Sequence, residues 1–290
     1  MTTIDIQHRS FEATLAACEA IGGVDLIVTS PPYPDARPGQ YGGDASRDFA
    51  WSDYQRLGDH VWRALKPGGF AAVNIDGPVR FWRDKKIGSE RSLIAFKLAI
   101  DWAERVGLRY VEHCAYVRDG APGLFGDRWR SGWEPVHVFQ RPGPSLADLT
   151  QARVSAKLAG TKHGRSRNRD AGGWVQSSAR VHADTRCITT AIQGFINCGT
   201  TDQEHPAPFG DWLADAFVLC YSPAGGLVCD PFMGSGTVAL SCVRHGRDVI
   251  GGDLGAREAD GRRWADIAKE RAIEIVNPTQ QGLFLLQSDS

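Results

Sequence analysis

The segment TSPPY at residues 29–33 places hydrogen-bonding groups at a rigid position in the chain. It directly follows the apolar run VDLIV at residues 24–28, which predicts a buried strand. Two consecutive prolines cannot continue a strand or a helix interior, because proline fixes φ and lacks a backbone N–H donor. The Ser30 hydroxyl and the Pro31 carbonyl are therefore acceptors that need not reorient to bind a donor. Taken alone, the segment is about equally well explained as a rigid strand exit.

A second candidate site lies at residues 230–237, where the sequence DPFMGSGT joins an apolar strand pattern to a helix pattern. Glycines let the backbone approach a ligand closely, and a helix N-terminus offers free N–H groups. The next predicted strand ends in Asp253, an acid suited to bind a pair of ribose hydroxyls. A nucleotide P-loop is disfavoured because its motif needs a lysine, and none lies between Pro231 and Val243. A glycine turn without ligand and a Rossmann dinucleotide site both stay open, since Gly234–Ala239 matches GxGxxA.

Alternating strand and helix patterns must position both segments. Apolar runs predict buried strands at residues 24–28, 70–75, 108–118, 135–141, 226–230 and 247–253. Helical spacing of apolar residues, closed in several cases by glycine, predicts helices at residues 54–66, 93–107, 208–222, 236–246 and 259–272. Strands separated by helices predict an α/β fold: a mostly parallel twisted sheet with helices on both faces.

Composition and charge narrow the function classes. The 290 residues carry a formal net charge of −1, so any attraction to nucleic acid must come from an uneven charge distribution. Residues 151–190 provide this uneven distribution, because they contain eight basic and two acidic side chains and so carry a local excess of six positive charges. The chain begins without a signal-peptide pattern and contains no apolar run long enough for a membrane span. Scattered cysteines and histidines without ligand spacing favour a cytoplasmic protein with no metal.

With both candidate sites in hand, the chain resembles the DNA amino-methyltransferases that use S-adenosylmethionine. In that family a (Ser/Asp/Asn)-Pro-Pro-(Tyr/Phe/Trp) motif holds the target base, and a Phe-x-Gly-x-Gly motif holds the methionine part of the cofactor. The catalytic motif precedes the cofactor motif, as in the circularly permuted group called β, so the resemblance implies a permuted class I methyltransferase sheet. The catalytic residues it implies are Ser30, Pro31, Pro32 and Tyr33.

Three further segments resemble this family. Residues 64–69 are similar to its VLKPGG segment, residues 134–139 to its late strand hEyilvf, and residues 204–209 to an HPaxFP segment that touches the cofactor. One position departs from the pattern: His8-Arg9-Ser10 stands where members often carry Gly-Asp, whose acid approaches the adenine side of the cofactor. The resemblance implies a cofactor site formed by His205, Pro206, Phe209, Asp230, Phe232, Gly234, Ser235, Gly236, Thr237 and Asp253.

The resemblance also divides the chain. It implies a catalytic half at residues 1–140, an inserted irregular target-recognition region at 141–200, a cofactor-binding half at 201–275 and a C-terminal tail at 276–290. Residues 34–50 are expected to form a loop that closes over the substrate, with an ordinary surface loop as an equal alternative.

The basic segment lies inside the expected recognition region. Arg165, Arg167 and Arg169 alternate with small polar residues and are predicted to meet phosphates or guanine edges of double-stranded DNA. A solvated loop explains the composition about equally well.

The chemistry follows from the properties of the target amine. The lone pair of an exocyclic amine is delocalised into the base, so acceptors at Ser30 and Pro31 would localise it for attack on a methyl group. Tyr33 would stack on a base flipped out of the duplex. In the resembling family, Ser at the first motif position goes mostly with cytosine N4 and Asp mostly with adenine N6. Ser30 therefore favours N4-methylcytosine, with adenine N6 as the alternative.

Other functions and partners are kept as hypotheses. An NAD-binding oxidoreductase would leave TSPPY without a role, and a DNA-binding protein that retains cofactor but has lost catalysis is a third reading. A cognate restriction endonuclease is an indirect partner expected of such enzymes. Gln280–Phe284 resembles the QxxLF pentapeptide that docks bacterial proteins on the sliding clamp, although packing of the tail on the body is the favoured explanation.

Overall fold

The structure is a computed structural model in which part of the chain is described. The described residues are 2–33, 49–81, 89–118, 131–155, 162–163, 167–170, 173–176, 180–181, 185–194, 210–257 and 259–276. Within these residues, no helix has the length and apolar character needed to cross a membrane.

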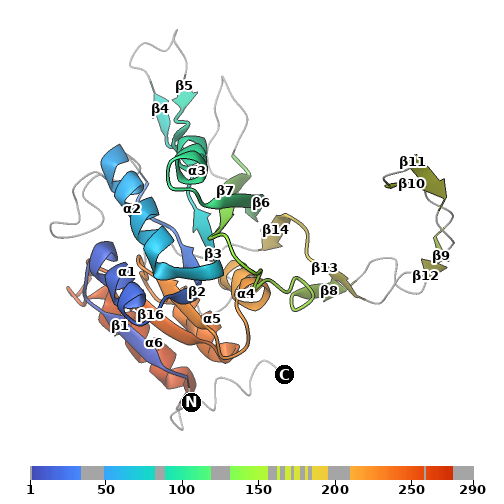
Figure 1. Cartoon of the computed structure of the whole chain (residues 1–290). Helices are drawn as coiled ribbons and strands as arrows, with labels where there is room; N and C mark the ends of the chain where they lie inside the picture. Colours follow the sequence, from blue (N-terminus) through green and yellow to red (C-terminus); the bar gives the residue numbers. More distant parts are fainter. Residues whose placement is uncertain are drawn as a thin grey trace.

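A central sheet of eight strands organises the described chain (Figure 1). Neighbouring strands pair in parallel except β7, which is antiparallel to both β3 and β6. In spatial order the strands are β1 (Ile4–Gln7), β16 (Asp248–Gly252), β15 (Leu227–Asp230), β2 (Val24–Thr29), β3 (Leu65–Asn74), β7 (Trp133–Gln140), β6 (Arg109–Arg118) and β14 (Ala191–Gly194). The predicted α/β fold with a mostly parallel sheet is therefore confirmed.

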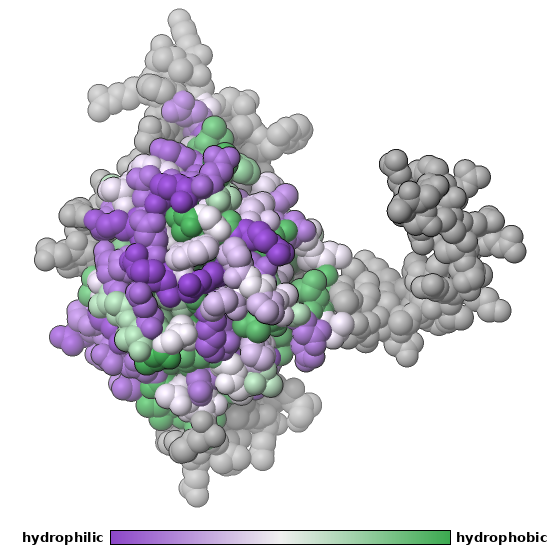
Figure 2. All heavy atoms as spheres, in the orientation of Figure 1, coloured by the Kyte–Doolittle hydropathy of each residue, from purple (hydrophilic) through white to green (hydrophobic). Residues whose placement is uncertain are grey.

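Helices cover both faces of the sheet and create two hydrophobic cores (Figure 1). One core contains α1 (Phe11–Ala20), α2 (Trp51–Ala64) and α3 (Ile94–Glu104). The other contains α4 (Asp211–Tyr221), α5 (Thr237–Arg244) and α6 (Trp264–Val276). Because β2 lies between the two cores, all six of its residues are buried, which explains why its sequence is mostly apolar. On the face shown in Figure 2, apolar residues form separate patches among hydrophilic ones.

Several predicted boundaries differ from the structure, and two of the differences change the assignment of a segment. The segment Lys66–Gly69 was expected to end a helix, but α2 ends at Ala64 and these residues begin β3. Their place in the strand is held by Lys66, whose ammonium lies 2.9 Å from Asp25 Oδ1, and by a bond of 2.9 Å from Gly68 N to Arg141 O. Local turn residues predicted a break, but long-range pairing continues the chain as a strand. The last helix begins at Trp264 rather than at residue 259.

Short antiparallel pairs occupy part of the expected recognition region. Three pairs are nested in sequence: β8 (Arg153–Ser155) with β13 (Thr185–Cys187), β9 (Lys162–His163) with β12 (Arg180–Val181), and β10 (Arg167–Asp170) with β11 (Gly173–Gln176). The sequence did not predict them, because its polar residues show no apolar alternation. β14 also falls within residues 141–200, yet it joins the main sheet beside β6. One further hairpin is formed by β4 (Val79–Phe81) and β5 (Ser89–Arg91).

A buried histidine in the sheet predicts a pH-dependent stability. His137 on β7 is 1% exposed, its Nδ1 lies 2.9 Å from the Tyr110 hydroxyl, and its Nε2 has no partner among the described atoms. Burial, reinforced by the charge of His113, lowers the pKa of His137 to about 4. The group is neutral in the folded protein but titrates near 6.5 when unfolded, so stability is full above pH 6.5 and falls as the pH drops toward 4. Between pH 7.5 and 5 the free energy of unfolding should fall by about 2 kcal/mol from this group alone.

Urea unfolding at the two pH values measures this loss. His137→Leu cannot titrate, so its unfolding free energy should change less between pH 7.5 and 5 than that of the wild type. An equal change in the two proteins would show that other groups cause the pH dependence.

Candidate active site

The two candidate segments lie at the switch point of the sheet. β15 and β2 are neighbours, with Val228 opposite Leu26 and Cys229 opposite Ile27. From β15 the chain continues through α5 to β16 on one side, and from β2 it continues through α2 to β3 on the other. Loops that follow the carboxyl ends of such strands diverge and leave a crevice where α/β proteins bind ligands. TSPPY and DPFMGSGT are these two loops.

The catalytic segment is held by contacts at both of its ends. Thr29, which precedes Ser30, is 1% exposed and donates its hydroxyl to Asp230 Oδ1 at 2.7 Å. The Tyr54 hydroxyl of α2 donates to the Pro32 carbonyl at 2.5 Å. This hydrogen bond engages the carbonyl of Pro32. The carbonyl predicted to accept a hydrogen bond from the substrate amine is the preceding one, of Pro31.

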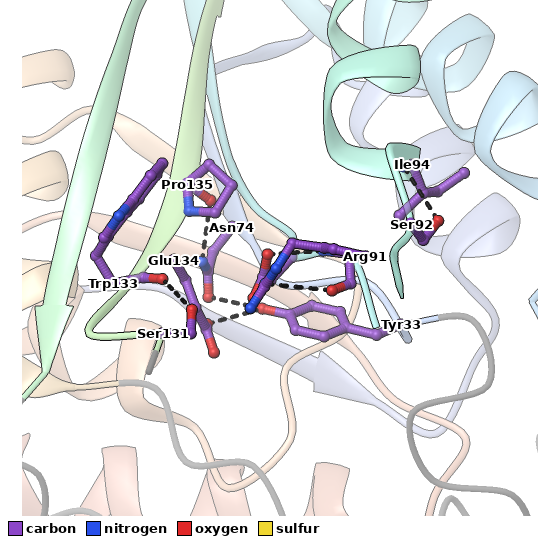
Figure 3. A network of polar contacts seen from close by, with 11 residues as sticks. Tyr33, Asn74, Arg91, Ser92, Ile94, Ser131, Trp133, Glu134 and Pro135 are labelled. Atoms are coloured by element: carbon purple, nitrogen blue, oxygen red, sulfur yellow. Dashed lines mark hydrogen bonds and ion pairs between the residues drawn. The ribbon is translucent and has the colours of Figure 1, made fainter. Parts of the chain in front are cut away.

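The hydroxyl of Tyr33 is the centre of a polar network (Figure 3). It lies 3.0 Å from Glu134 Oε2 and 3.2 Å from Asn74 Oδ1, and it also interacts with the Ser30 side chain. Burial raises the pKa of Tyr33 well above its ordinary value of 10, and the charge of Glu134 raises it further. The phenol is therefore a neutral donor over the whole physiological pH range.

The two partners of Tyr33 come from adjacent strands at the same edge of the sheet. Asn74 ends β3 and is 3% exposed, while Glu134 lies at the start of the antiparallel strand β7 and is 8% exposed. Because β7 runs opposite to β3, its beginning meets the end of β3, where the catalytic segment also lies. The pairing of the two strands therefore places a buried carboxylate beside the predicted base-binding tyrosine.

A second carboxylate lies near this network. The charge of Asp76 contributes to the raised pKa of Tyr33. Asp76 accepts the Gly77 N–H at 2.7 Å and forms an ion pair of 2.5 Å with Arg91 of β5. The ion pair ties the β4–β5 hairpin to the rim of the site (Figure 3).

The glycine-rich loop has the backbone geometry that its sequence predicts. Gly234 and Gly236 have φ values of 51° and 93°, and Gly236 is the residue before the first turn of α5. A Cβ on Gly236 would lie 2.7 Å from the Cβ of Ala268 in α6, so a side chain is excluded by packing as well as by conformation. Ser235 and Thr237 are each 3% exposed. The loop therefore presents backbone groups rather than bulky side chains.

Asp253 anchors this loop. Its Oδ2 accepts the Gly234 N–H at 2.8 Å and its Oδ1 accepts the Gly255 N–H at 2.7 Å. Each carboxylate oxygen keeps a further lone pair for a ligand hydroxyl. The residue thus combines a structural contact with the position predicted for a ribose-binding acid.

Asp230 links the two loops. Its Oδ1 accepts both the Thr29 hydroxyl at 2.7 Å and the Phe232 N–H at 3.0 Å. Burial raises the pKa of Asp230 to about 7, against the lowering effect of these two bonds. The residue is 5% exposed, so it positions the loop rather than facing a ligand directly.

Phe232 packs against aromatic rings from the other half of the chain. Its centroid lies 5.5 Å from that of Phe11 in α1 and 5.7 Å from that of Phe49 before α2. Phe49 in turn packs on Tyr54 at 4.7 Å. Aromatic contacts at these distances hold the glycine-rich loop against α1 and against the residues at the start of α2.

The segment that departs from the family pattern has structural roles here. Ser10 is the N-cap of α1 and accepts the Ala13 N–H at 3.3 Å. Arg9 forms an ion pair of 3.1 Å with Asp5. No carboxylate stands at residues 8–10, as the sequence shows.

Several predicted residues fall outside the part of the chain that can be described. These are residues 34–48 of the expected loop, Arg165, the cofactor residues His205, Pro206 and Phe209, and the motif Gln280–Phe284. For Arg167 and Arg169 the backbone is described, and they pair with Gln176 and Trp174 in the β10–β11 hairpin. Across the described residues, no group of three or more His, Cys, Asp or Glu side chains is arranged to hold a metal ion.

Comparison with known proteins identifies the family. The model of the N6/N4 DNA methylases matches residues 24–261, which include both candidate loops. The chain belongs to this family of DNA methylases. It is a DNA methyltransferase, and the resemblance found in its motifs is confirmed. Membership excludes the NAD-binding oxidoreductase as a reading of the glycine loop.

Individual relatives agree with this result. The orphan methyltransferase M.BamHII of Bacillus amyloliquefaciens is 27% identical over 258 residues, covering 86% of this chain and 88% of the relative. The PvuII DNA methyltransferase, described as cytosine-N4-specific, superposes with a TM-score of 0.61 at 18% identity and covers 95% of this chain and 93% of its own. The M1.HpyAVI complex with S-adenosylmethionine has a TM-score of 0.57 at 16% identity, with 93% and 100% covered. The solved structures establish the fold, and S-adenosylmethionine is the methyl donor of the family.

Sequence reasoning missed part of the polar network. Asn74 and Glu134 received no role, although each is a polar residue at the end of an otherwise apolar strand pattern. A polar residue in a buried strand indicates a specific hydrogen bond, because a buried polar group needs a partner. The partner itself, Tyr33, could be found only from the sheet pairing.

Proposed function

We propose that this methyltransferase transfers a methyl group from S-adenosylmethionine to the exocyclic N4 amine of cytosine at a specific site in double-stranded DNA. The observation that carries the proposal is Ser30, a neutral acceptor beside Tyr33 where adenine-specific relatives mostly have Asp. The PvuII enzyme, whose description names cytosine N4, has the same fold and supports this choice. Adenine N6 is the alternative, because the matching family model covers both reactions.

The residues of the described loops fit the cofactor. The glycines of the loop at Gly234–Gly236 adopt positive φ and place no side chain over its backbone, and Asp253 keeps lone pairs for ribose hydroxyls. Phe232, Ser235, Thr237 and the buried Asp230 hold that loop in place, and His205, Pro206 and Phe209 are proposed to complete the site. When bound, S-adenosylmethionine supplies a methyl group on a positively charged sulfur.

The catalytic segment prepares the amine for attack. The Ser30 hydroxyl and the Pro31 carbonyl accept the amine N–H bonds, which draws the nitrogen lone pair out of conjugation with the ring. Pro31 and Pro32 fix the carbonyl, and Tyr54 holds the Pro32 carbonyl at 2.5 Å, so these groups are oriented before the base arrives. The Tyr33 ring stacks on the flipped base. Positioning of this kind contributes on the order of several kcal/mol to the barrier reduction.

Residues 141–200 are proposed to recognise the target sequence, with Arg165, Arg167 and Arg169 contacting phosphates or guanine edges. A restriction endonuclease that reads the same sequence is an indirect partner, and the clamp contact at Gln280–Phe284 stays a hypothesis that a pull-down with purified clamp can test. The proposed boundaries are those of the sequence, with a catalytic half before this region and a cofactor-binding half after it.

Label transfer tests the activity. Purified protein is incubated with S-adenosylmethionine carrying tritium in its methyl group and with plasmid DNA from a host that lacks the gene. Acid-insoluble label should accumulate in the DNA in proportion to enzyme and time. Calorimetric binding of S-adenosylmethionine without label transfer would instead support a protein that retains cofactor but has lost catalysis.

A further inference from the structure

We propose that Glu134 is the terminal acceptor of the proton that the target amine loses, and that the proton reaches it through the hydroxyls of Ser30 and Tyr33. The inference rests on the proposed methyl transfer to an exocyclic amine. It assigns a function to a buried carboxylate that the acceptor role of the catalytic segment does not use.

The geometry at Tyr33 directs its proton to Glu134. A phenol has one proton to donate, and two acceptors lie within reach, Glu134 Oε2 at 3.0 Å and Asn74 Oδ1 at 3.2 Å. The orientation of the Asn74 amide is fixed because its Nδ2 donates to the Pro135 carbonyl at 3.2 Å. The carboxylate is both closer and the stronger acceptor, since charge-assisted hydrogen bonds are about twice as strong as neutral ones.

The same network directs the proton of Ser30 toward Tyr33. The single proton of Tyr33 is directed to Glu134, so in its contact with the Ser30 side chain the Tyr33 oxygen accepts and the Ser30 hydroxyl donates. With its proton directed to Tyr33, the Ser30 oxygen keeps lone pairs for the amine. The order of donation is therefore amine to Ser30, Ser30 to Tyr33 and Tyr33 to Glu134, and the last of these contacts is drawn in Figure 3.

Bonds, protons and charges balance when the reaction follows this path. The carbon–sulfur bond of the donor breaks, a carbon–nitrogen bond forms, and the nitrogen takes over the positive charge. The amine N–H proton then moves to Ser30 Oγ as the Ser30 proton moves to Tyr33 Oη and the Tyr33 proton moves to Glu134. A sulfonium and a carboxylate are converted to a neutral thioether and a neutral carboxylic acid, and Glu134 later returns the proton to water.

Charge and burial favour Glu134 as the end of the path. Glu134 is 8% exposed, so its charge acts over short distances with little screening by solvent. Asp76 is the other carboxylate whose charge acts on Tyr33, but Glu134 is the one that accepts the hydrogen bond of the Tyr33 hydroxyl, at 3.0 Å. A merely structural Glu134 would only hold the ring of Tyr33, and glutamine could do this equally well by accepting the same hydrogen bond.

Glu134→Gln separates the two roles. In single-turnover assays with saturating DNA and cofactor, we expect the rate to fall at least about 100-fold, the lower range for loss of general acid–base catalysis. Dissociation constants for S-adenosylmethionine and DNA should stay within about twofold of wild type. Tyr33→Phe should lose the relay as well, and the double variant should be no slower than the slower single variant, because both changes interrupt one path. A wild-type rate in Glu134→Gln would overturn the proposal.

Glu112→Gln is the matched control. Glu112 is an acid on β6, the strand beside β7, with a side chain that is 45% exposed, and its substitution should leave the single-turnover rate unchanged. A similar fall in Glu112→Gln would assign the effect to a general loss of negative charge and would also overturn the proposal.

A readout without cofactor or DNA tests the contact itself. Fluorotyrosine is incorporated, and the ¹⁹F resonance of Tyr33 is assigned by its absence in Tyr33→Phe. This resonance should titrate at lower pH in Glu134→Gln than in wild type, because a negative charge that raises the pKa of Tyr33 has been removed. An unchanged titration contradicts the relay even if methylation is observed. If wild-type protein shows the expected titration but never methylates DNA, the proposed function fails and the contact stands.

Discussion

Replacement of Ser30 by alanine is expected to lower the single-turnover rate of methyl transfer about 100- to 1000-fold, the range seen when one preorganised hydrogen-bonding group is removed from a reacting centre. Two effects add in this variant, because the Ser30 oxygen is proposed to accept the amine N–H and also interacts with the Tyr33 hydroxyl. The side chain lies at the end of a fully buried strand, so the change removes one polar group without opening the core. Binding of S-adenosylmethionine should be nearly unchanged.

Ser92→Ala provides the comparison. Among the described residues, its hydroxyl accepts the Ile94 N–H at 3.3 Å at the start of α3, so the deletion is chemically the same but lies away from the TSPPY segment. Its rate should match wild type.

Ser30→Asp tests base selection instead, because this variant keeps an acceptor at the position and adds a negative charge. We expect its residual activity to shift toward adenine. Full activity of Ser30→Ala would show that this oxygen does not act on the substrate.

Gly236→Ala is the second change with a large expected effect. The residue has φ of 93°, and an added Cβ would meet Ala268 of α6 at 2.7 Å from its Cβ and 2.9 Å from its Cα. A non-glycine residue in this backbone region costs about 1–2 kcal/mol, and overpacking adds about 1–3 kcal/mol. The loop must move to relieve the contact, so affinity for S-adenosylmethionine should fall at least about tenfold along with the melting temperature.

Gly246→Ala, at the other end of the same helix, separates conformation from packing. Its φ is 67°, but an added Cβ would meet nothing within 4 Å. This variant should lose only the conformational cost, about 1 kcal/mol of unfolding free energy, and should bind cofactor normally. Calorimetric titration and thermal unfolding measure both quantities. Equal losses in the two variants would mean that the packing of α6 does not shape the cofactor loop.

The fold was largely predictable because its signals are local. Mostly apolar runs predicted the buried strands at residues 24–28 and 226–230, and the two loops that follow them contain recognisable proline and glycine motifs. The antiparallel strand β7 was not distinguished from its parallel neighbours, since an apolar run has the same appearance in either direction. Residues 66–69 were predicted to end a helix because proline and glycine are local helix-ending signals. The ion pair of Lys66 with Asp25 helps to hold this segment in the strand, and such a long-range contact is not visible in the local sequence.

The candidate site could be proposed from the sequence where one segment supplies the residues. Ser30 to Tyr33 and Asp230 to Thr237 each lie on a single loop, and their motifs could be read directly. Glu134 is separated from Tyr33 by 101 residues, and their hydrogen bond depends on the register of β7 with β3. The bond of Thr29 with Asp230, separated by 201 residues, depends in the same way on the pairing of β2 with β15.

The central claim is that Ser30 selects the N4 amine of cytosine. It is tested most directly by mass analysis of nucleosides from DNA methylated by the purified protein with S-adenosylmethionine carrying a ¹³C-labelled methyl group. We predict labelled N4-methylcytosine in the digest. Labelled N6-methyladenine without N4-methylcytosine would contradict the claim.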